Sequence, residues 1–108
     1  MSATIPAGSR KTKISFHIGQ FVQTVTDGEA FITVWDGTVG SGTQLGQAYA
    51  VKRSAGTQGM NGIGGFVVAS PSAGSKTYNI GLHRGGAGGT ATIAASSTNP
   101  AFVLVEFV

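Results

Sequence analysis

The last eight residues, AFVLVEFV at 101–108, alternate between two faces that are both almost entirely apolar. Successive side chains of a strand point to opposite sides of a sheet. One face therefore holds Phe102, Leu104 and Glu106, and the other holds Val103, Val105 and Phe107. A thin β-sandwich covers one face of each sheet and leaves the other in water. The pattern predicts that the second face of this strand meets a partner, and we expect another copy of the chain.

Periodic segments of the same kind recur along the whole chain. Residues 29–35 have apolar or aromatic side chains on both faces, whereas residues 11–18 alternate apolar with polar side chains, as a half-buried strand requires. The run GFVVA at 65–69 is typical of a short buried strand. Further strands are expected at 21–25, 44–53, 76–83, 90–95 and 101–108. About eight short strands and no amphipathic helix predict an all-β sandwich, jelly roll or barrel.

The connections between these strands have turn composition. Asp27-Gly28 and Asp36-Gly37 are turn signals, because Asp and Gly tolerate the positive φ of tight hairpin turns. Residues 54–62 are expected to form a loop. Residues 1–9 have no period and little to bury, so we expect an N-terminal arm, with one domain over residues 10–108.

Composition narrows the class of protein. Only 10% of the 108 residues are charged, against roughly 25% in an ordinary soluble domain. The absence of cysteine excludes disulfides and thiolate metal sites. A net charge of +3 is too small to indicate a nucleic-acid-binding surface. No signal peptide or membrane span is expected, because no apolar run approaches the required length.

The segments SAGSKTYNI, GGTATIAASSTNPAF and LVEF, which follow GFVVA within residues 65–108, carry a resemblance to a known family. In this order they resemble the C-terminal half of small jelly-roll domains in virion proteins of tailed bacteriophages, both head decoration (cement) proteins and tail-fibre tips. The resemblance implies a trimeric architecture similar to that of tumour necrosis factor, with the closing strand near the three-fold axis. We therefore expect a single jelly-roll β-sandwich of about eight antiparallel strands that forms a homotrimer through Phe102, Leu104 and Glu106.

The resemblance also implies a role. Because the chain starts at Met1 and holds only the jelly roll and a short arm, a capsid decoration protein is favoured over a fibre tip. Such a protein is a non-enzymatic structural component that binds the major capsid protein on the outer surface of the phage head and bridges capsid subunits. Three arms on one body would bind more strongly than a single arm.

Basic side chains are the candidate capsid contacts. Arg10, Lys11 and Lys13, together with Lys52-Arg53, could meet acidic capsid residues, although they could equally serve solubility alone. In the alternative role, a receptor-binding tip of a tail fibre that recognises glycans, Trp35 and Tyr49 could stack on sugars. Core positions are the more common place for such aromatic residues.

Glu106 is the one acid in the closing strand, and a buried carboxylate without a partner is costly. It is expected at an exposed rim, hydrogen-bonded, or paired with Arg84 or Lys76 of a neighbouring copy. A solvated edge position is the alternative reading.

The sequence offers few candidate residues for catalysis or metal binding. His17 and His83 show no metal-ligand spacing and are expected on the surface. Asp27, Glu29 and Asp36 could in principle hold calcium, but their spacing matches no calcium loop and turns explain both Asp-Gly pairs. The RGGAGG segment lacks the Lys-Ser/Thr of a phosphate loop. We expect no enzyme activity, cofactor, metal, nucleic acid, membrane or small-molecule substrate.

Overall fold

The computed structural model describes residues 1–8, 11–23, 29–52, 58–85 and 90–108. Within these ranges it contains eight strands and no helix. The strands are β1 (Ser2–Ile5), β2 (Thr12–Gln23), β3 (Glu29–Asp36), β4 (Thr43–Lys52), β5 (Gln58–Ala69), β6 (Gly74–Gly85), β7 (Ala91–Ala94) and β8 (Phe102–Phe107). The all-β prediction is confirmed.

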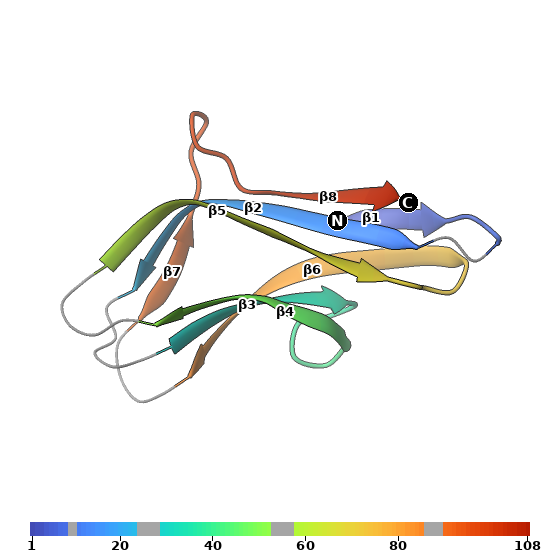
Figure 1. Ribbon diagram of the computed structural model, residues 1–108, viewed down its shortest axis with the longest axis horizontal. Helices are drawn as coiled ribbons and strands as arrows, with labels where there is room; N and C mark the ends of the chain where they lie inside the picture. Colours follow the sequence, from blue (N-terminus) through green and yellow to red (C-terminus); the bar gives the residue numbers. More distant parts are fainter. Residues whose placement is uncertain (9–10, 24–28, 53–57, 86–89) are drawn as a thin grey trace.

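Two antiparallel sheets pack together as a sandwich (Figure 1). The first sheet has the order β1-β6-β3-β4, and the second has the order β5-β2-β7 with β8 also paired to β2. The long strand β2 pairs with β5 along one edge. Its other edge is shared, because β8 pairs with residues 12–17 and β7 with residues 20–23. The body is thin, with a shortest extent of 18 Å.

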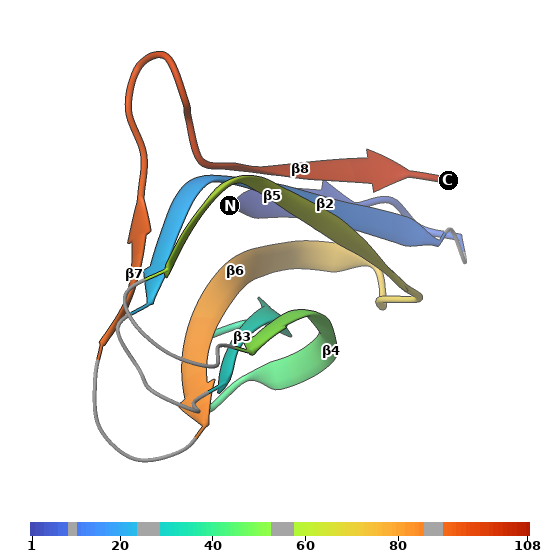
Figure 2. The ribbon, with the colours of Figure 1, turned by 60° about the vertical axis from the view of Figure 1, so that its left-hand side comes forward.

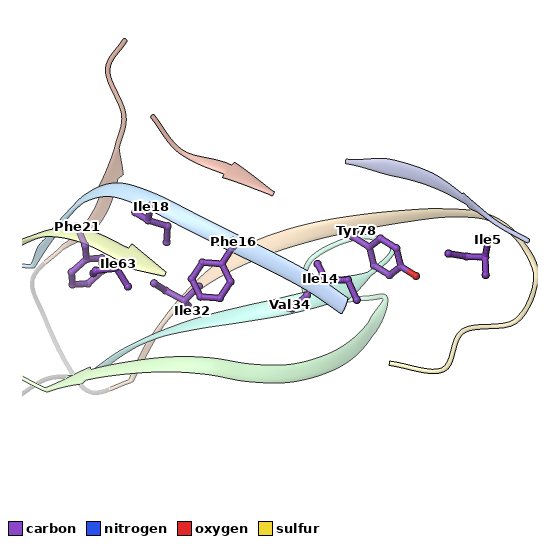
Figure 3. Close-up of a cluster of buried hydrophobic side chains, with 9 residues drawn as sticks. All are labelled: Ile5, Ile14, Phe16, Ile18, Phe21, Ile32, Val34, Ile63 and Tyr78. Atoms are coloured by element: carbon purple, nitrogen blue, oxygen red, sulfur yellow. The ribbon is translucent and has the colours of Figure 1, made fainter. Parts of the chain in front are cut away.

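The core lies between β2 and the strands β3 and β6 (Figure 3). Alternate residues of β2 point into it, as the one-sided pattern of residues 11–18 predicts. The buried apolar side chains are Ile5, Ile14, Phe16, Ile18, Phe21, Ile32, Val34, Ile63 and Tyr78. Each large aliphatic or aromatic side chain that is fully buried contributes roughly 1.5–3 kcal/mol to stability, so this small cluster is the main source of stability within the chain.

The segment expected to be an arm contains a strand. β1 pairs with β6 from Ser2↔Thr77 to Ile5↔Gly74. The Met1 amino group donates to the Tyr78 carbonyl over 2.7 Å, and Ile5 is 3% exposed. The prediction that this segment has little to bury is therefore wrong: a single buried isoleucine next to an open strand edge is enough to order it.

The strand count agrees with the sequence, but the strands differ. The predicted strands at 11–18 and 21–25 are one continuous strand, β2, which runs through Gly19. β5 begins at Gln58, so the prediction of a loop over residues 54–62 is wrong for its described part. The glycines of this part disfavour a strand locally, yet β5 pairs with β2 from Gln23↔Gln58 to Thr12↔Ala69. Tertiary pairing overrides local propensity here.

Residues 95–101, between β7 and β8, stand away from the two layers in both ribbon views (Figures 1 and 2). Ser96 and Asn99 close a turn by mutual backbone hydrogen bonds of 3.0 and 3.2 Å. The Asn99 side-chain amide donates to the Gly19 carbonyl. The connection is therefore attached to β2 at the point where pairing changes from β8 to β7.

Tyr78 is fully buried, and its hydroxyl has no hydrogen-bond partner among the described residues. Burial raises the pKa of Tyr78 above its ordinary value of 10.0, and the nearby negative charge of Asp36 raises this pKa further. The folded chain therefore keeps the phenolic proton at a pH where the unfolded chain has lost it. Stability tied to this group is fully present below the unfolded pKa and is lost as pH rises through the folded pKa.

Tyr78→Phe is expected to leave stability at pH 7 unchanged or to raise it by about 1 kcal/mol, because it removes a buried hydroxyl without a partner. It should also flatten the fall in stability above about pH 10. Denaturant unfolding at pH 7 and at alkaline pH measures both effects. Thr12→Val is the matched control, since Thr12 is also buried with an unpartnered hydroxyl that does not titrate. A steep alkaline fall that persists in Tyr78→Phe would contradict the assignment to Tyr78.

Candidate functional site

Large apolar side chains gather on the outer face of the second sheet. Phe66 and Val68 of β5 are 60% and 50% exposed, and Phe102 and Leu104 of β8 are 52% and 46% exposed. We call these four residues the apolar face. Exposed apolar residues that occur singly need no explanation, but a contiguous patch indicates an interaction surface.

The register of β2 with its two neighbours makes this patch contiguous. Ser15 lies opposite Phe66 on one side and opposite Leu104 on the other. The small serine therefore separates two large apolar side chains at the centre. His17 lies opposite Phe102, and their rings stack with centroids 5.4 Å apart.

An ion pair lies at one end of the apolar face. Lys13 and Glu106 are cross-strand partners, and Lys13 Nζ lies 3.4 Å from a Glu106 carboxylate oxygen. Lys13 Nζ also lies 5.3 Å from the centroid of the Phe66 ring. Because the two charges cancel, this end of the face carries no net charge.

The partner of Glu106 differs from the expected one. Glu106 pairs with Lys13 of its own chain, and Lys76 is paired instead with Asp36 over 3.3 Å. The side chain of Arg84 lies outside the described residues. The geometric reason is register: antiparallel pairing of β8 with β2 places Lys13 directly opposite Glu106.

The structure brings together residues that were predicted for two separate purposes. Phe102, Leu104 and Glu106, the predicted subunit contacts, share one face with Lys13, a predicted capsid contact. Lys11 is exposed where β2 begins, and Arg10 lies outside the described residues. One residue of the predicted basic cluster, Lys13, therefore lies at the end of the apolar face.

The two-sided pattern of the closing strand is confirmed. Val103 and Val105 pack against the core, whereas Phe102 and Leu104 on the other side are left about half exposed. The sequence does not single out Phe66 and Val68, because the run 65–69 predicts a buried strand. The run does form part of β5, but the prediction that it is buried is wrong: β5 lies at the edge of the sheet beside β2, and none of the described residues covers the outer side of Phe66 and Val68. The usable signal was that this run, like the closing strand, has apolar residues on both sides.

An apolar hollow of about 510 Å³ lies beside Phe102. Its lining is mostly apolar and comes from both sheets. The lining residues include Met1, Phe16, Ile18, Ile80, Ile93 and Val103. Protein interiors are normally packed without such voids, so the sandwich is incompletely closed on this side.

The outer face of the first sheet holds a second hollow of about 510 Å³, which we call the aromatic groove. It lies over β3, β4 and β6 and the connection that follows β3. Its lining includes Phe31, Thr33, Trp35, Val39, Gln44, Gln47 and His83. Trp35, one of the two aromatic residues considered for sugar stacking, is only half-buried; the side chain of Tyr49 lies outside the described residues.

The described residues hold no group of three or more His, Cys, Asp or Glu that could bind a metal ion. Of the acids considered for calcium, Asp36 is ion-paired with Lys76, and Asp27 lies outside the described ranges. His17 stacks on Phe102 and His83 packs near Phe31, on different sheets. Across the part of the chain that the structure describes, no helix is long and apolar enough to span a membrane.

Comparison of the chain with protein-family models, curated proteins and solved structures gives no match. The functional argument therefore depends on the geometry of the two faces and on the sequence resemblance.

Proposed function

We propose that the chain is a non-enzymatic structural virion protein that assembles as a homotrimer and decorates the outer surface of a phage capsid. The apolar face is the observation that carries the proposal. Four large side chains on β5 and β8, the two strands that flank β2, are about half exposed. The core of the domain holds only nine apolar side chains among the described residues. Covering this face would supply burial that a thin subunit lacks.

Another copy of the chain is a suitable partner for this surface. The Lys13–Glu106 pair is already neutralised within one subunit, so two copies can approach without like-charge repulsion. The apolar hollow beside Phe102 continues the surface between the sheets and offers space for a side chain of a neighbour. Cyclic symmetry closes such contacts into a discrete assembly. The number three comes from the resemblance to trimeric virion domains.

The jelly-roll topology is part of the proposal. A jelly roll can be viewed as a long hairpin rolled into two sheets, so that its strand pairs are nested along the chain. β2 with β7 and β3 with β6 are nested pairs of this kind. The other strands depart from the scheme: β1 pairs with β6 and β8 with β2 instead of with each other, and β4 pairs with β3 and β5 with β2 instead of with each other.

The proposal is tested by the mass of the purified protein in light scattering, followed by binding of the same sample to phage capsids that lack decoration protein. A trimer that binds capsids supports both parts. A trimer that ignores capsids but binds host cells supports the alternative, a receptor-binding tip of a tail fibre, for which the aromatic groove is the structural support. A monomer that binds neither contradicts the proposal.

Capsid binding should depend on exposed basic residues near the start of β2. Lys11→Glu is expected to reduce binding to decoration-free capsids several-fold, and higher salt should weaken the wild type in the same direction. A binding titration at low and high ionic strength measures both. Deleting residues 1–9 is unsuitable because Ile5 belongs to the core, so Lys76→Gln, a charge change elsewhere on the surface, serves as control. Equal binding by wild type and Lys11→Glu would exclude Lys11 from the contact.

A further inference from the structure

We propose that the aromatic groove is a binding site for a neutral saccharide. The site lies on the first sheet and the apolar face lies on the second, so the inference does not depend on the proposed trimer or on capsid decoration. Capsid decoration does not require the aromatic groove, and the inference assigns a class of ligand to it.

The shape of the groove follows from the register of β3 and β6. Phe31 lies opposite His83, and four residues farther along β3 Trp35 lies opposite Asn79. Between these rows Thr33 lies opposite Gly81, which has no side chain. Trp35 and Val39 close over Gly81 and, together with Phe31 and His83, line the hollow on the sheet surface. A Cβ added at Gly81 would come within 2.8 Å of both Thr33 Oγ1 and Val39 Cγ1, so the position has no room for a larger residue.

The walls of the groove are held in place. Trp35 Nε1 donates to Thr33 Oγ1 over 2.8 Å, and Thr33 Oγ1 donates to the Gly81 carbonyl over 3.3 Å. The Asn79 amide donates to the Gly37 carbonyl over 2.8 Å and fixes the connection that carries Val39. These contacts orient the indole before any ligand arrives, which lowers the entropy cost of binding.

The chemistry of the lining selects the ligand class. Phe31 and Trp35 offer apolar aromatic surface, which matches the C–H face of a pyranose ring. Gln44 and Gln47 are exposed, and neither side-chain amide has a hydrogen-bond partner within the described residues. Each amide can donate and accept, as paired sugar hydroxyls require.

Charge and size agree with this choice. The described residues that line the groove include no Asp, Glu, Lys or Arg, so they offer no counter-ion to an acidic sugar, a phosphate or a charged peptide. The volume of about 510 Å³ falls within the roughly 300–1,000 Å³ typical of small-molecule sites. A neutral hexose or N-acetylhexosamine satisfies both conditions.

Trp35 provides a direct readout because it is the only tryptophan in the chain. The intact protein is titrated with glucose, galactose, mannose, N-acetylglucosamine and the acidic N-acetylneuraminic acid, and tryptophan fluorescence is followed. At least one neutral sugar is expected to give a saturable change with a dissociation constant on the order of 1 mM, as a small ligand in an open site implies. The absence of a saturable change with every neutral sugar up to about 100 mM, or a response to the acidic sugar alone, would overturn the proposal.

Gln44→Ala/Gln47→Ala is expected to weaken this binding about tenfold or more, because it removes both free amides from an exposed edge strand without touching the core. Gln20→Ala, which removes an exposed glutamine outside the groove, should bind like the wild type. Unchanged affinity in the double variant would contradict the assigned site. A variant that no longer trimerises should still bind the sugar, which separates failure of this inference from failure of the proposed function.

Discussion

Replacing Phe102 and Leu104 together by serine is expected to convert the proposed trimer into single chains. Full burial of a large apolar side chain contributes roughly 1.5–3 kcal/mol. About half of each side chain is already covered within one subunit, so each replacement should remove about 1 kcal/mol from the interface. Six replacements in a trimer amount to about 6 kcal/mol, or roughly four orders of magnitude in the dissociation constant. The mass in light scattering should fall from about three times 10.9 kDa to 10.9 kDa.

The subunit itself should survive these changes, because substitutions at exposed positions usually alter stability by less than about 0.5 kcal/mol. Circular dichroism of the variant should match that of the wild type. Val39→Ser is the matched control, since Val39 is also a 44% exposed apolar residue but lies over the first sheet. An assembly of unchanged mass in the double variant would place the subunit interface away from β8.

The double variant Phe66→Ser/Val68→Ser tests whether the β5 half of the apolar face also takes part in assembly. If subunits meet over β8 alone, the β5 variant keeps its mass. If the face is buried as a unit, both double variants lose assembly. Sequence reasoning could not pose this question, because Phe66 and Val68 were assigned to the core and only the register with Ser15 shows that they adjoin Leu104.

The fold class and the core of β2 could be predicted because they depend on local periodicity. Ile14, Phe16 and Ile18 alternate with polar residues. A period of two indicates a half-buried strand, with the apolar residues on the buried face. The failures lie where a distant strand decides the outcome. β1 is ordered by its pairing with β6, from Ser2↔Thr77 to Ile5↔Gly74, and no pattern within residues 1–9 encodes that distant partner.

The two candidate surfaces differ in the same way: one follows from a local pattern, and the other depends on pairing between distant strands. The two-sided pattern of the closing strand is visible in the sequence, so Phe102 and Leu104 could be predicted as surface contacts. The aromatic groove could not be assembled in the same way, because it needs Gly81 of β6 opposite Thr33 of β3 and the connection that carries Val39 above them. Single residues such as Trp35 were visible, but their common surface arises only from the order β6-β3-β4.

Gly19→Ala is expected to lower stability by about 1–3 kcal/mol, through overpacking against backbone. Gly19 is buried at the point where β2 changes partner, and a Cβ there would clash with the backbone carbonyl oxygen of Asn99. The turn at 96–99 must therefore move, because a clash with a backbone atom cannot be relieved by a change of side-chain rotamer. Thermal unfolding should shift down by several degrees for each kcal/mol lost. This measurement is best made in the Phe102→Ser/Leu104→Ser variant, because thermal unfolding of a single chain does not depend on protein concentration.

Asn99→Ala distinguishes the clash from the hydrogen bond that joins the same two residues. It removes the donor to the Gly19 carbonyl without adding an atom at Gly19, and should cost about 1 kcal/mol. If the turn has already moved in Gly19→Ala, that hydrogen bond is already lost, and the double variant should be less destabilised than the two single effects predict. Full additivity, or a melting temperature unchanged by Gly19→Ala, would contradict the close approach. Because β8 begins at Phe102, directly after this connection, a displaced turn should also weaken the proposed assembly when Gly19→Ala is placed in the wild-type chain.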